Sequence, residues 1–313
     1  MLSEEVLEQL RECDDFPVPT SLMLRIIDLG RDPEASFDDV EDVIKTDPGM
    51  VARILQVANS PLYGVRQCDN LREALLLIGI DGSLALALAF CVQQMQKDMQ
   101  RNLSDKVIDL DSYWRRSLLC ALASRVIGRM LKRKDAEQLF LIGLMQDIGI
   151  LALAQIRPQI YGSLPGDDAG NFHTRCCEAE LAALGADHAD VSAWLIEYWG
   201  LPQKFSVAAY CSHCITGTGL TQTQAEAFDL CVAFSGAIAD MYLLSEFPAS
   251  FRATAERMQA LLGLNAAALA DALSLVCAQV NQLEAIFAMP VLDEHLREQK
   301  LRQAQAALTM RML

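Results

Sequence analysis

Positive charge is scarce in this sequence. Its 313 residues include 26 Lys and Arg against 41 Asp and Glu, which gives a formal net charge of -15 at pH 7. Broad contact with nucleic acid or with an anionic membrane needs clustered Lys and Arg. We therefore expect no broad nucleic-acid binding and no membrane partner.

Several structural signals are missing as well. The sequence has no convincing alternation of apolar and polar residues typical of half-buried strands, no glycine-rich phosphate loop and no internal repeat. Instead, nearly every segment repeats apolar residues with the spacing of an amphipathic helix. With 52% hydrophobic residues, the chain can bury a large core. These patterns predict an all-α protein of two or three helical subdomains.

The first residues lack the features of a secretory signal. The start Met-Leu-Ser-Glu-Glu-Val is acidic and has no basic segment followed by an apolar one. We therefore expect a cytoplasmic protein, in which the cysteines stay reduced. Most of the ten cysteines should pack as small apolar side chains.

One stretch organises the chain. Leu139–Ala154 is apolar except for the adjacent pair Gln146 and Asp147. Burying an unpaired carboxylate is costly, so Asp147 needs a metal, a cation or a set of hydrogen-bond donors opposite it. The stretch is too short and too interrupted for a membrane span of about 20 apolar residues. We predict that it forms the innermost helix and that function centres on Asp147.

Local signals predict where other helices begin and end. Ser36 and Asp39 have the spacing of a capping box, and Asp47 precedes a first-turn proline. The apolar stretch Leu71–Val92 should form two helices split at Asp81-Gly-Ser83, with Asp81 as the cap of the second.

Further along, two helices are expected over Phe172–Leu184 and His188–Tyr198. A glycine-rich surface loop, Tyr161–Gly170, should precede them and lie at the mouth of the site that Asp147 faces.

The polar stretch Lys97–Asp111 marks the best domain boundary. We expect an N-terminal helical module at residues 1–105 and a core at residues 106–222, whose first helix is capped by Asp111. Long helices over residues 223–313 should complete the core.

A set of short motifs along the chain is more specific than any single one of them. The motifs are Asp47-Pro48, Ala58-Asn-Ser60 with Tyr63-Gly64, Tyr113-Trp114 with Ser117, Asp147-Ile-Gly149, His188 with Ala193-Trp-Leu195, and Trp199-Gly-Leu-Pro202. Together they resemble the HDOD family, the HD-related output domains of bacterial signalling proteins, over roughly residues 14–240. The resemblance implies an N-terminal helical module packed on a degenerate core related to the HD phosphohydrolases.

The resemblance also implies a site. HD enzymes bind a divalent metal through a histidine, an adjacent His-Asp pair and a later aspartate, and the metal activates water against a phosphate ester. In this sequence the four positions are Arg116, Gln146, Asp147 and Gly236. An amide and a guanidinium do not replace imidazole ligands. We therefore expect a vestigial site with no catalysis, no metal and no cofactor.

Without a metal, Asp147 needs another cation. In the family's geometry the position of Arg116 faces the central helix, and a guanidinium can make two hydrogen bonds to one carboxylate. We predict that Arg116 pairs with Asp147 in place of the ion.

Two clusters of cysteine and histidine have two interpretations. The first cluster is His173, Cys176 and Cys177, and the second is Cys211, His213 and Cys214. A zinc site joining them is the sharper interpretation. We favour ordinary buried side chains, because neither spacing matches the paired Cys-x2-Cys motifs of structural zinc sites. Cys176-Cys177 as a redox sensor would need a lowered thiol pKa.

His188 and His213 fall where the family often carries histidines beside its vestigial site. With Asn59 they are candidates for a small-molecule or nucleotide pocket, although structural histidines and a helix-capping asparagine are the plainer interpretation. We expect a non-catalytic signalling or regulatory protein that binds other signalling proteins. The alternative is a residual metal-dependent phosphohydrolase or cyclic-dinucleotide phosphodiesterase.

Overall fold

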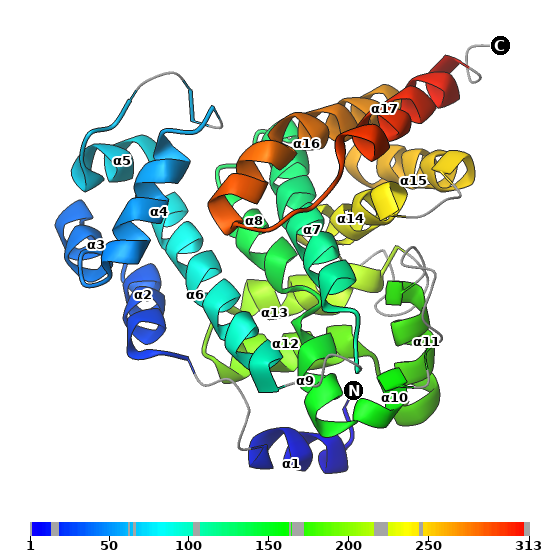
Figure 1. Ribbon diagram of the computed structural model, residues 1–313, viewed down its shortest axis with the longest axis horizontal. Coiled ribbons are helices and arrows are strands. Elements are labelled where there is room, and N and C mark those ends of the chain that lie inside the picture. Colours follow the sequence, from blue (N-terminus) through cyan, green and yellow to red (C-terminus); the bar gives the residue numbers. More distant parts are fainter. Residues whose placement is uncertain are drawn as a thin grey trace.

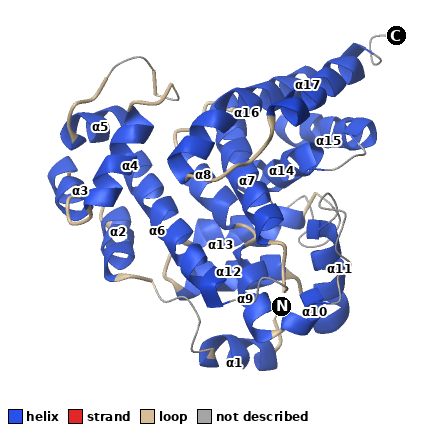
Figure 2. Ribbon diagram, in the orientation of Figure 1, coloured by secondary structure: helices blue, strands red, loops and turns tan. Residues whose placement is uncertain are grey.

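The computed structural model describes residues 2–13, 19–61, 63–64, 67–102, 107–162, 164, 172–215, 225–243 and 247–309. Within these ranges the chain forms helices and no strand, so the predicted all-α fold is confirmed (Figure 2). The helices are α1 (Glu4–Glu12), α2 (Ser21–Arg31), α3 (Phe37–Ile44), α4 (Pro48–Ala58), α5 (Leu71–Ile78), α6 (Ile80–Asn102), α7 (Leu110–Met130), α8 (Ala136–Met145), α9 (Ile148–Ile156), α10 (Pro158–Gly162), α11 (Phe172–Leu184), α12 (His188–Tyr198), α13 (Gln203–Tyr210), the 3-10 helix η2 (Cys211–His213), α14 (Ala227–Leu243), α15 (Phe247–Leu262), α16 (Ala266–Phe287) and α17 (Glu294–Thr309).

The helices form groups that are clear in Figure 1. Helices α2 to α5 lie together on one side, and the long helix α6 connects them with the rest of the molecule. Helix α7 is central and packs against α8, α14 and α16, while α9 packs against α12. The last helices, α15 to α17, lie beside α14 at the opposite side from α3. The predicted domain boundaries at residues 105 and 222 fall outside the described residues.

Two of the predicted caps are confirmed. Ser36 accepts a hydrogen bond from the Asp39 backbone N–H, and the Asp39 carboxylate accepts one from the Ser36 N–H, which completes a capping box. Asp47 caps α4 by accepting from the Met50 N–H at 3.1 Å. Each of these bonds satisfies a backbone donor that has no partner inside the helix.

Two other helix ends were predicted at the wrong residue. The stretch Leu71–Val92 is split as expected, but at Gly79, whose φ of +87° favours glycine, and Asp81 lies inside the first turn of α6. The two helices meet at an angle of 109°. Asp109, not Asp111, caps α7, because its carboxylate accepts from the Ser112 N–H at 3.1 Å.

The central stretch is the most buried part of the molecule, as predicted, but it is two helices. Helix α8 ends at Met145 and α9 begins at Ile148, so Gln146 and Asp147 lie in the turn between them. At this turn the Gly149 N–H donates to the Ser192 hydroxyl of α12 at 2.8 Å. The hydrogen bond to another helix replaces a bond within the helix, and the ladder is interrupted there.

Burial, not length, decides the membrane question for this stretch. Taken together, α8 and α9 (Ala136–Ile156) are long and apolar enough to cross a membrane. The same holds for α16 and for the bent pair of α5 and α6. The expectation that the central stretch is too short was therefore wrong. Within the apolar window of Ala136–Ile156, however, 89% is buried inside the protein, against 50% for α16.

Candidate functional site

The turn between α8 and α9 places Asp147 at the centre of the fold. Its side chain is 2% exposed. The turn lies close against α12, because a Cβ added at Gly149 would be only 2.2 Å from the His188 carbonyl oxygen. Only glycine permits this approach, which gives the Asp147-Ile-Gly149 motif a structural reason. The approach brings Asp147 and His188 to the same place.

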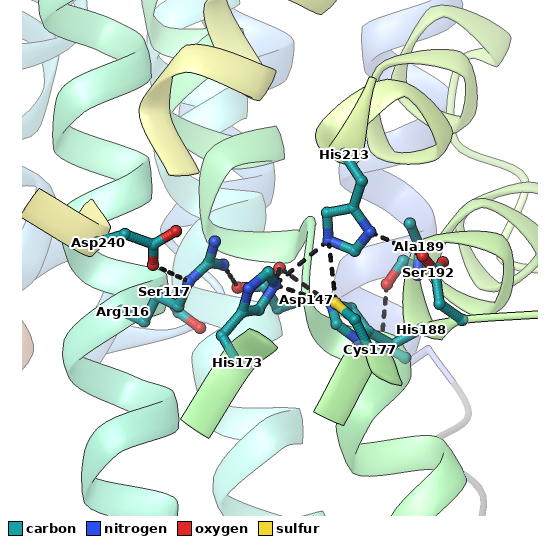
Figure 3. Close-up of polar contacts among 12 residues, drawn as sticks. Arg116, Ser117, Asp147, His173, Cys177, His188, Ala189, Ser192, His213 and Asp240 are labelled. Carbon is teal, nitrogen blue, oxygen red and sulfur yellow. Dashed lines mark hydrogen bonds and ion pairs between the residues drawn. The ribbon is translucent and has the colours of Figure 1, made fainter. Parts of the chain in front are cut away.

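Arg116 of α7 is the cation that faces Asp147, as predicted. Its Nη1 donates to Asp147 Oδ2, and its Nε donates to Asp240 Oδ1 of α14 at 3.0 Å (Figure 3). Burial disfavours the charged forms, but the pair outweighs this effect. Arg116 holds the pKa of Asp147 well below its usual range, and the two carboxylates hold the pKa of Arg116 well above its own.

The other two vestigial positions surround this ion pair. A Cβ added at Gly236 of α14 would lie 3.0 Å from Arg116 Nη2 and 3.7 Å from Gln146 Nε2. Gln146 is 1% exposed, and its Oε1 has no hydrogen-bond partner among the described residues. The four predicted positions therefore do meet. The glycine at residue 236 leaves the room that the guanidinium fills.

A second group of side chains lies on the other side of Asp147. We call it the His/Cys cluster: His173 and Cys177 of α11, His188 of α12 and His213 of η2. Figure 3 shows the three imidazole rings turned towards one another. The Nε2 atoms of His173 and His188 are 3.0 Å apart, and those of His173 and His213 are 3.2 Å apart. Asp147 Oδ1 is 3.6 Å from His173 Nε2 and 3.7 Å from His188 Nε2.

Buried carboxylates orient two of these histidines. Glu180 Oε2 is 2.7 Å from His188 Nδ1, and Asp187 Oδ2 is 2.8 Å from His213 Nδ1. A carboxylate only accepts, so each Nδ1 carries a proton and each Nε2 points into the cluster. Burial opposes a charged imidazole at His188, but Glu180 outweighs burial and raises the pKa of His188 to about 10.

The buried Glu180 is itself fully engaged. Its Oε1 accepts from the Tyr161 hydroxyl at 2.6 Å, and its Oε2 also accepts from the His188 backbone N–H at 2.7 Å. Tyr161 lies buried in α10. The prediction that it begins a surface loop was therefore wrong. Most of the predicted loop over residues 161–170 falls outside the described residues.

The two predicted Cys/His clusters do not form as two separate groups, but some members of both meet in one group. His173, Cys177 and His213 meet with His188, whereas Cys176 is not part of the group. All ten cysteines are thiols rather than disulfides. Burial raises the pKa of both Cys176 and Cys177, so neither has the lowered thiol pKa that a redox sensor needs.

Asn59 has a different role from the one proposed for a pocket. It ends α4, and its side chain makes two hydrogen bonds to the backbone of Cys68, one to the carbonyl at 3.0 Å and one from the N–H at 2.7 Å. The amide thus fastens the chain between α4 and α5. His188 and His213 are brought together, at 0% and 4% exposure, whereas the side-chain hydrogen bonds of Asn59 go to Cys68.

Three acidic residues of this region were not predicted from the sequence. Asp240 lies one helical turn after Gly236 on α14, so the spacing alone could have suggested that it faces Arg116. Asp187 caps α12 by accepting from the Ala189 N–H at 2.9 Å, a role its place before His188 could have indicated. Nothing in the sequence singles out Glu180.

The fold and these motifs agree with a known family. The model of the HDOD domain matches residues 16–215, which is more than half of the chain. The chain belongs to the HDOD domain family. Among curated proteins, none matches it.

Several solved structures share the fold. An HDOD domain protein of unknown function from Geobacter sulfurreducens is 20% identical, with a TM-score of 0.64 over 91% of this chain and 97% of its own. A candidate signal transduction protein from Marinobacter aquaeolei VT8 is 19% identical, with a TM-score of 0.62 over 91% of this chain and 65% of its own. A candidate phosphohydrolase from Shewanella amazonensis SB2B is 16% identical, with a TM-score of 0.60 over 97% of each chain. At these identities the likeness is one of fold.

The metal of the related HD enzymes does not fit this HDOD chain. At the four corresponding positions the Arg116 guanidinium bonds to Asp147 and reaches the space beside Gly236. A permanently positive group beside the single remaining carboxylate repels a second cation and uses one oxygen that would bind it. Gln146 offers only an amide. No hydrolytic step therefore follows from these residues.

Proposed function

We propose that this HDOD protein is a non-catalytic regulator in signal transduction that acts by binding other proteins. The observation that carries the proposal is the Arg116–Asp147 ion pair at the position where an HD enzyme holds its metal. An HD hydrolase needs that ion to polarise the phosphate and to generate the attacking hydroxide. With a guanidinium in its place, the core keeps its fold and has no means of activating water there.

The alternative is a residual phosphohydrolase or cyclic-dinucleotide phosphodiesterase. Two structural relatives from Shewanella amazonensis, each with 16% identity, bear the names of a candidate phosphohydrolase and a candidate metal-dependent phosphohydrolase. These names support the alternative. We expect purified protein to hydrolyse neither a generic phosphodiester nor a cyclic dinucleotide in the presence of Mn²⁺ or Mg²⁺. Hydrolysis above the protein-free rate that is lost in Asp147→Asn would overturn the non-catalytic assignment.

Partner binding is tested separately. We expect a pull-down from the native cytosol with the full chain as bait to recover a signalling protein reproducibly. The name of the Marinobacter relative, a candidate signal transduction protein, agrees with such a partner. Recovery of nothing beyond what unrelated acidic bait protein captures would count against a protein-binding role.

A small molecule or nucleotide is a second candidate ligand. An open cleft of about 700 Å³ lies where α2 and the start of α6 approach α8, and Arg31, Asp81, Lys134 and Glu137 are among its lining residues. Small-molecule sites commonly have volumes of about 300–1,000 Å³. Protection of Lys134 from acylation by an added ligand would place the ligand there.

A further inference from the structure

The geometry of the His/Cys cluster is unusual for a set of core residues. The chain has four histidines, and three of them meet at one point although they come from α11, α12 and η2. Zinc–nitrogen bonds of about 2.0–2.1 Å in a tetrahedron place neighbouring nitrogens about 3.3 Å apart. The two measured Nε2–Nε2 distances, 3.0 and 3.2 Å, are close to that edge.

Cys177 supplies a fourth corner. Its Sγ is 4.0 Å from His213 Nε2, and all four ligand atoms lie within 4.8 Å of one another. The nitrogen–sulfur edge of a tetrahedral zinc site is about 3.6 Å, given a zinc–sulfur bond of about 2.3 Å. His173 and Cys177 are one helical turn apart on α11, so both side chains reach the same side of that helix.

The cluster turns its ligand atoms to one point. Nδ1 of His188 and of His213 faces a carboxylate and carries a ring proton, so Nε2 is the atom that each of these rings turns to the centre. His173 Nε2 and Cys177 Sγ complete the group of four ligand atoms. Asp147 Oδ1, buried next to the cluster, has no hydrogen-bond partner among the described residues. A cation at the centre satisfies these groups together.

The carboxylates behind the histidines are the arrangement found around metal ions. A metal-binding histidine commonly donates its other ring N–H to a carboxylate, which fixes the tautomer and makes the ligand more basic. Glu180 and Asp187 do this for His188 and His213 at 2.7 and 2.8 Å. Their own remaining bonds, to Tyr161 and to the start of α12, hold them in place.

We propose that the His/Cys cluster binds one divalent transition-metal ion of the zinc class. Three imidazoles and a thiolate suit zinc and its neighbours and not Mg²⁺ or Ca²⁺, which prefer oxygen. On binding, Cys177 Sγ and His188 Nε2 each release a proton to solvent, and Sγ and the three Nε2 lone pairs form the bonds to the ion. Four protein ligands close the coordination sphere, so the ion links α11, α12 and η2 and leaves no position for a catalytic water.

This site is separate from the HD metal position that Arg116 fills. The metal proposal can also fail independently of the regulatory proposal. Metal binding is measured on the protein without any partner, and the tests of the regulatory role are a hydrolysis assay and a pull-down. The first test is the metal content of the full chain, purified without a histidine tag from cells supplied with zinc. We expect one zinc per chain, which a strong chelator removes.

Cobalt reports the ligand set directly. We expect Co²⁺ added to the stripped protein to give the intense visible bands of a four-coordinate ion and a thiolate-to-cobalt band in the near ultraviolet. Cys177→Ser should abolish the thiolate band, and His213→Ala should abolish stoichiometric binding. Cys176→Ser is the matched control for the neighbouring thiol, and His295→Ala is the control for the exposed fourth histidine. Both controls should keep the full spectrum.

The carboxylate behind His188 gives an independent test. Glu180→Gln keeps the shape of the side chain and should weaken Co²⁺ or Zn²⁺ affinity by about 10–100-fold, the usual effect of losing such a partner. If the variant is misfolded by circular dichroism, Asp187→Asn at His213 replaces it. Purified protein that holds no zinc and gives no four-coordinate cobalt spectrum would overturn the proposal. A thiolate band that survives Cys177→Ser or disappears in Cys176→Ser would do so too.

Discussion

Removing Arg116 should destabilise the protein more than removing Asp147. In Arg116→Met, the Asp147 carboxylate stays 2% exposed and loses the guanidinium, and breaking a buried ion pair by removing one partner costs about 3–5 kcal/mol. In Asp147→Leu, by contrast, Arg116 keeps Asp240, whose side chain is 28% exposed and within 3.0 Å. We therefore expect the loss in Asp147→Leu to be smaller than in Arg116→Met.

The double variant measures the interaction itself. Met and Leu together leave no unpaired charge between α7 and α8, so the double variant should recover about 2 kcal/mol relative to the sum of the single losses, within the usual range for contacting residues. The assay is denaturant unfolding of the chelator-treated protein, followed by circular dichroism, with comparison of midpoints and slopes. Chelation keeps any ion away from the neighbouring histidines.

The same helix offers a matched control. Arg125 is also buried in α7, at 1% exposure, but lies nine residues from Arg116, about 13 Å along the helix. Arg125→Met combined with Asp147→Leu should be additive within about 0.5 kcal/mol. If Arg116→Met with Asp147→Leu is equally additive, or if Asp147→Leu is the more damaging single change, the ion-pair argument is refuted.

Three further outcomes follow from the packing. Gly149→Ala should cost about 1–3 kcal/mol in unfolding free energy, because its Cβ would lie 2.2 Å from the His188 carbonyl oxygen, which is backbone and cannot turn away. Native protein treated with iodoacetamide at neutral pH should be alkylated first at the half-buried Cys13. Burial raises the pKa of Cys91 to about 12, so Cys91 should be labelled only after denaturant is added. Peptide mass spectrometry can follow the labelling of both residues. Truncation near Pro290 should leave a folded protein with weakened partner binding in pull-downs, and wholesale loss of helical circular dichroism would show instead that α17 is a structural lid.

Local chemistry explains which parts of the fold were predictable. The caps at Ser36 and Asp47 depend on residues three positions apart, and such signals can be recognised in the sequence. The Arg116–Asp147 pair was predictable for another reason: a lone acid in an apolar stretch demands a cation, and the family motifs indicated which residue supplies it.

The misplaced features depend on contacts between distant residues. The central stretch breaks because Gly149 donates to Ser192, which is 43 positions later in the sequence. His173 and His213 are 40 positions apart, and the helices that bring them together have no spacing signature of a metal site. The break falls at Gly79, whose φ of +87° favours glycine, and not at Asp81 two residues later, and the helices on either side of it are bent by 109°.

The two oxygens of Asp147 face different neighbours. Oδ2 accepts from Arg116, and Oδ1 faces His173 and His188 at 3.6 and 3.7 Å. The single negative charge of Asp147 thus faces the permanent positive charge of Arg116 on one side. On the other side it faces the histidines, where the positive charge depends on whether a metal ion is bound. Any positive charge that arrives on the histidine side competes for the carboxylate that holds the guanidinium. By thermodynamic reciprocity, a change that strengthens the Arg116 contact must lower the affinity on the histidine side by the same factor, and the reverse.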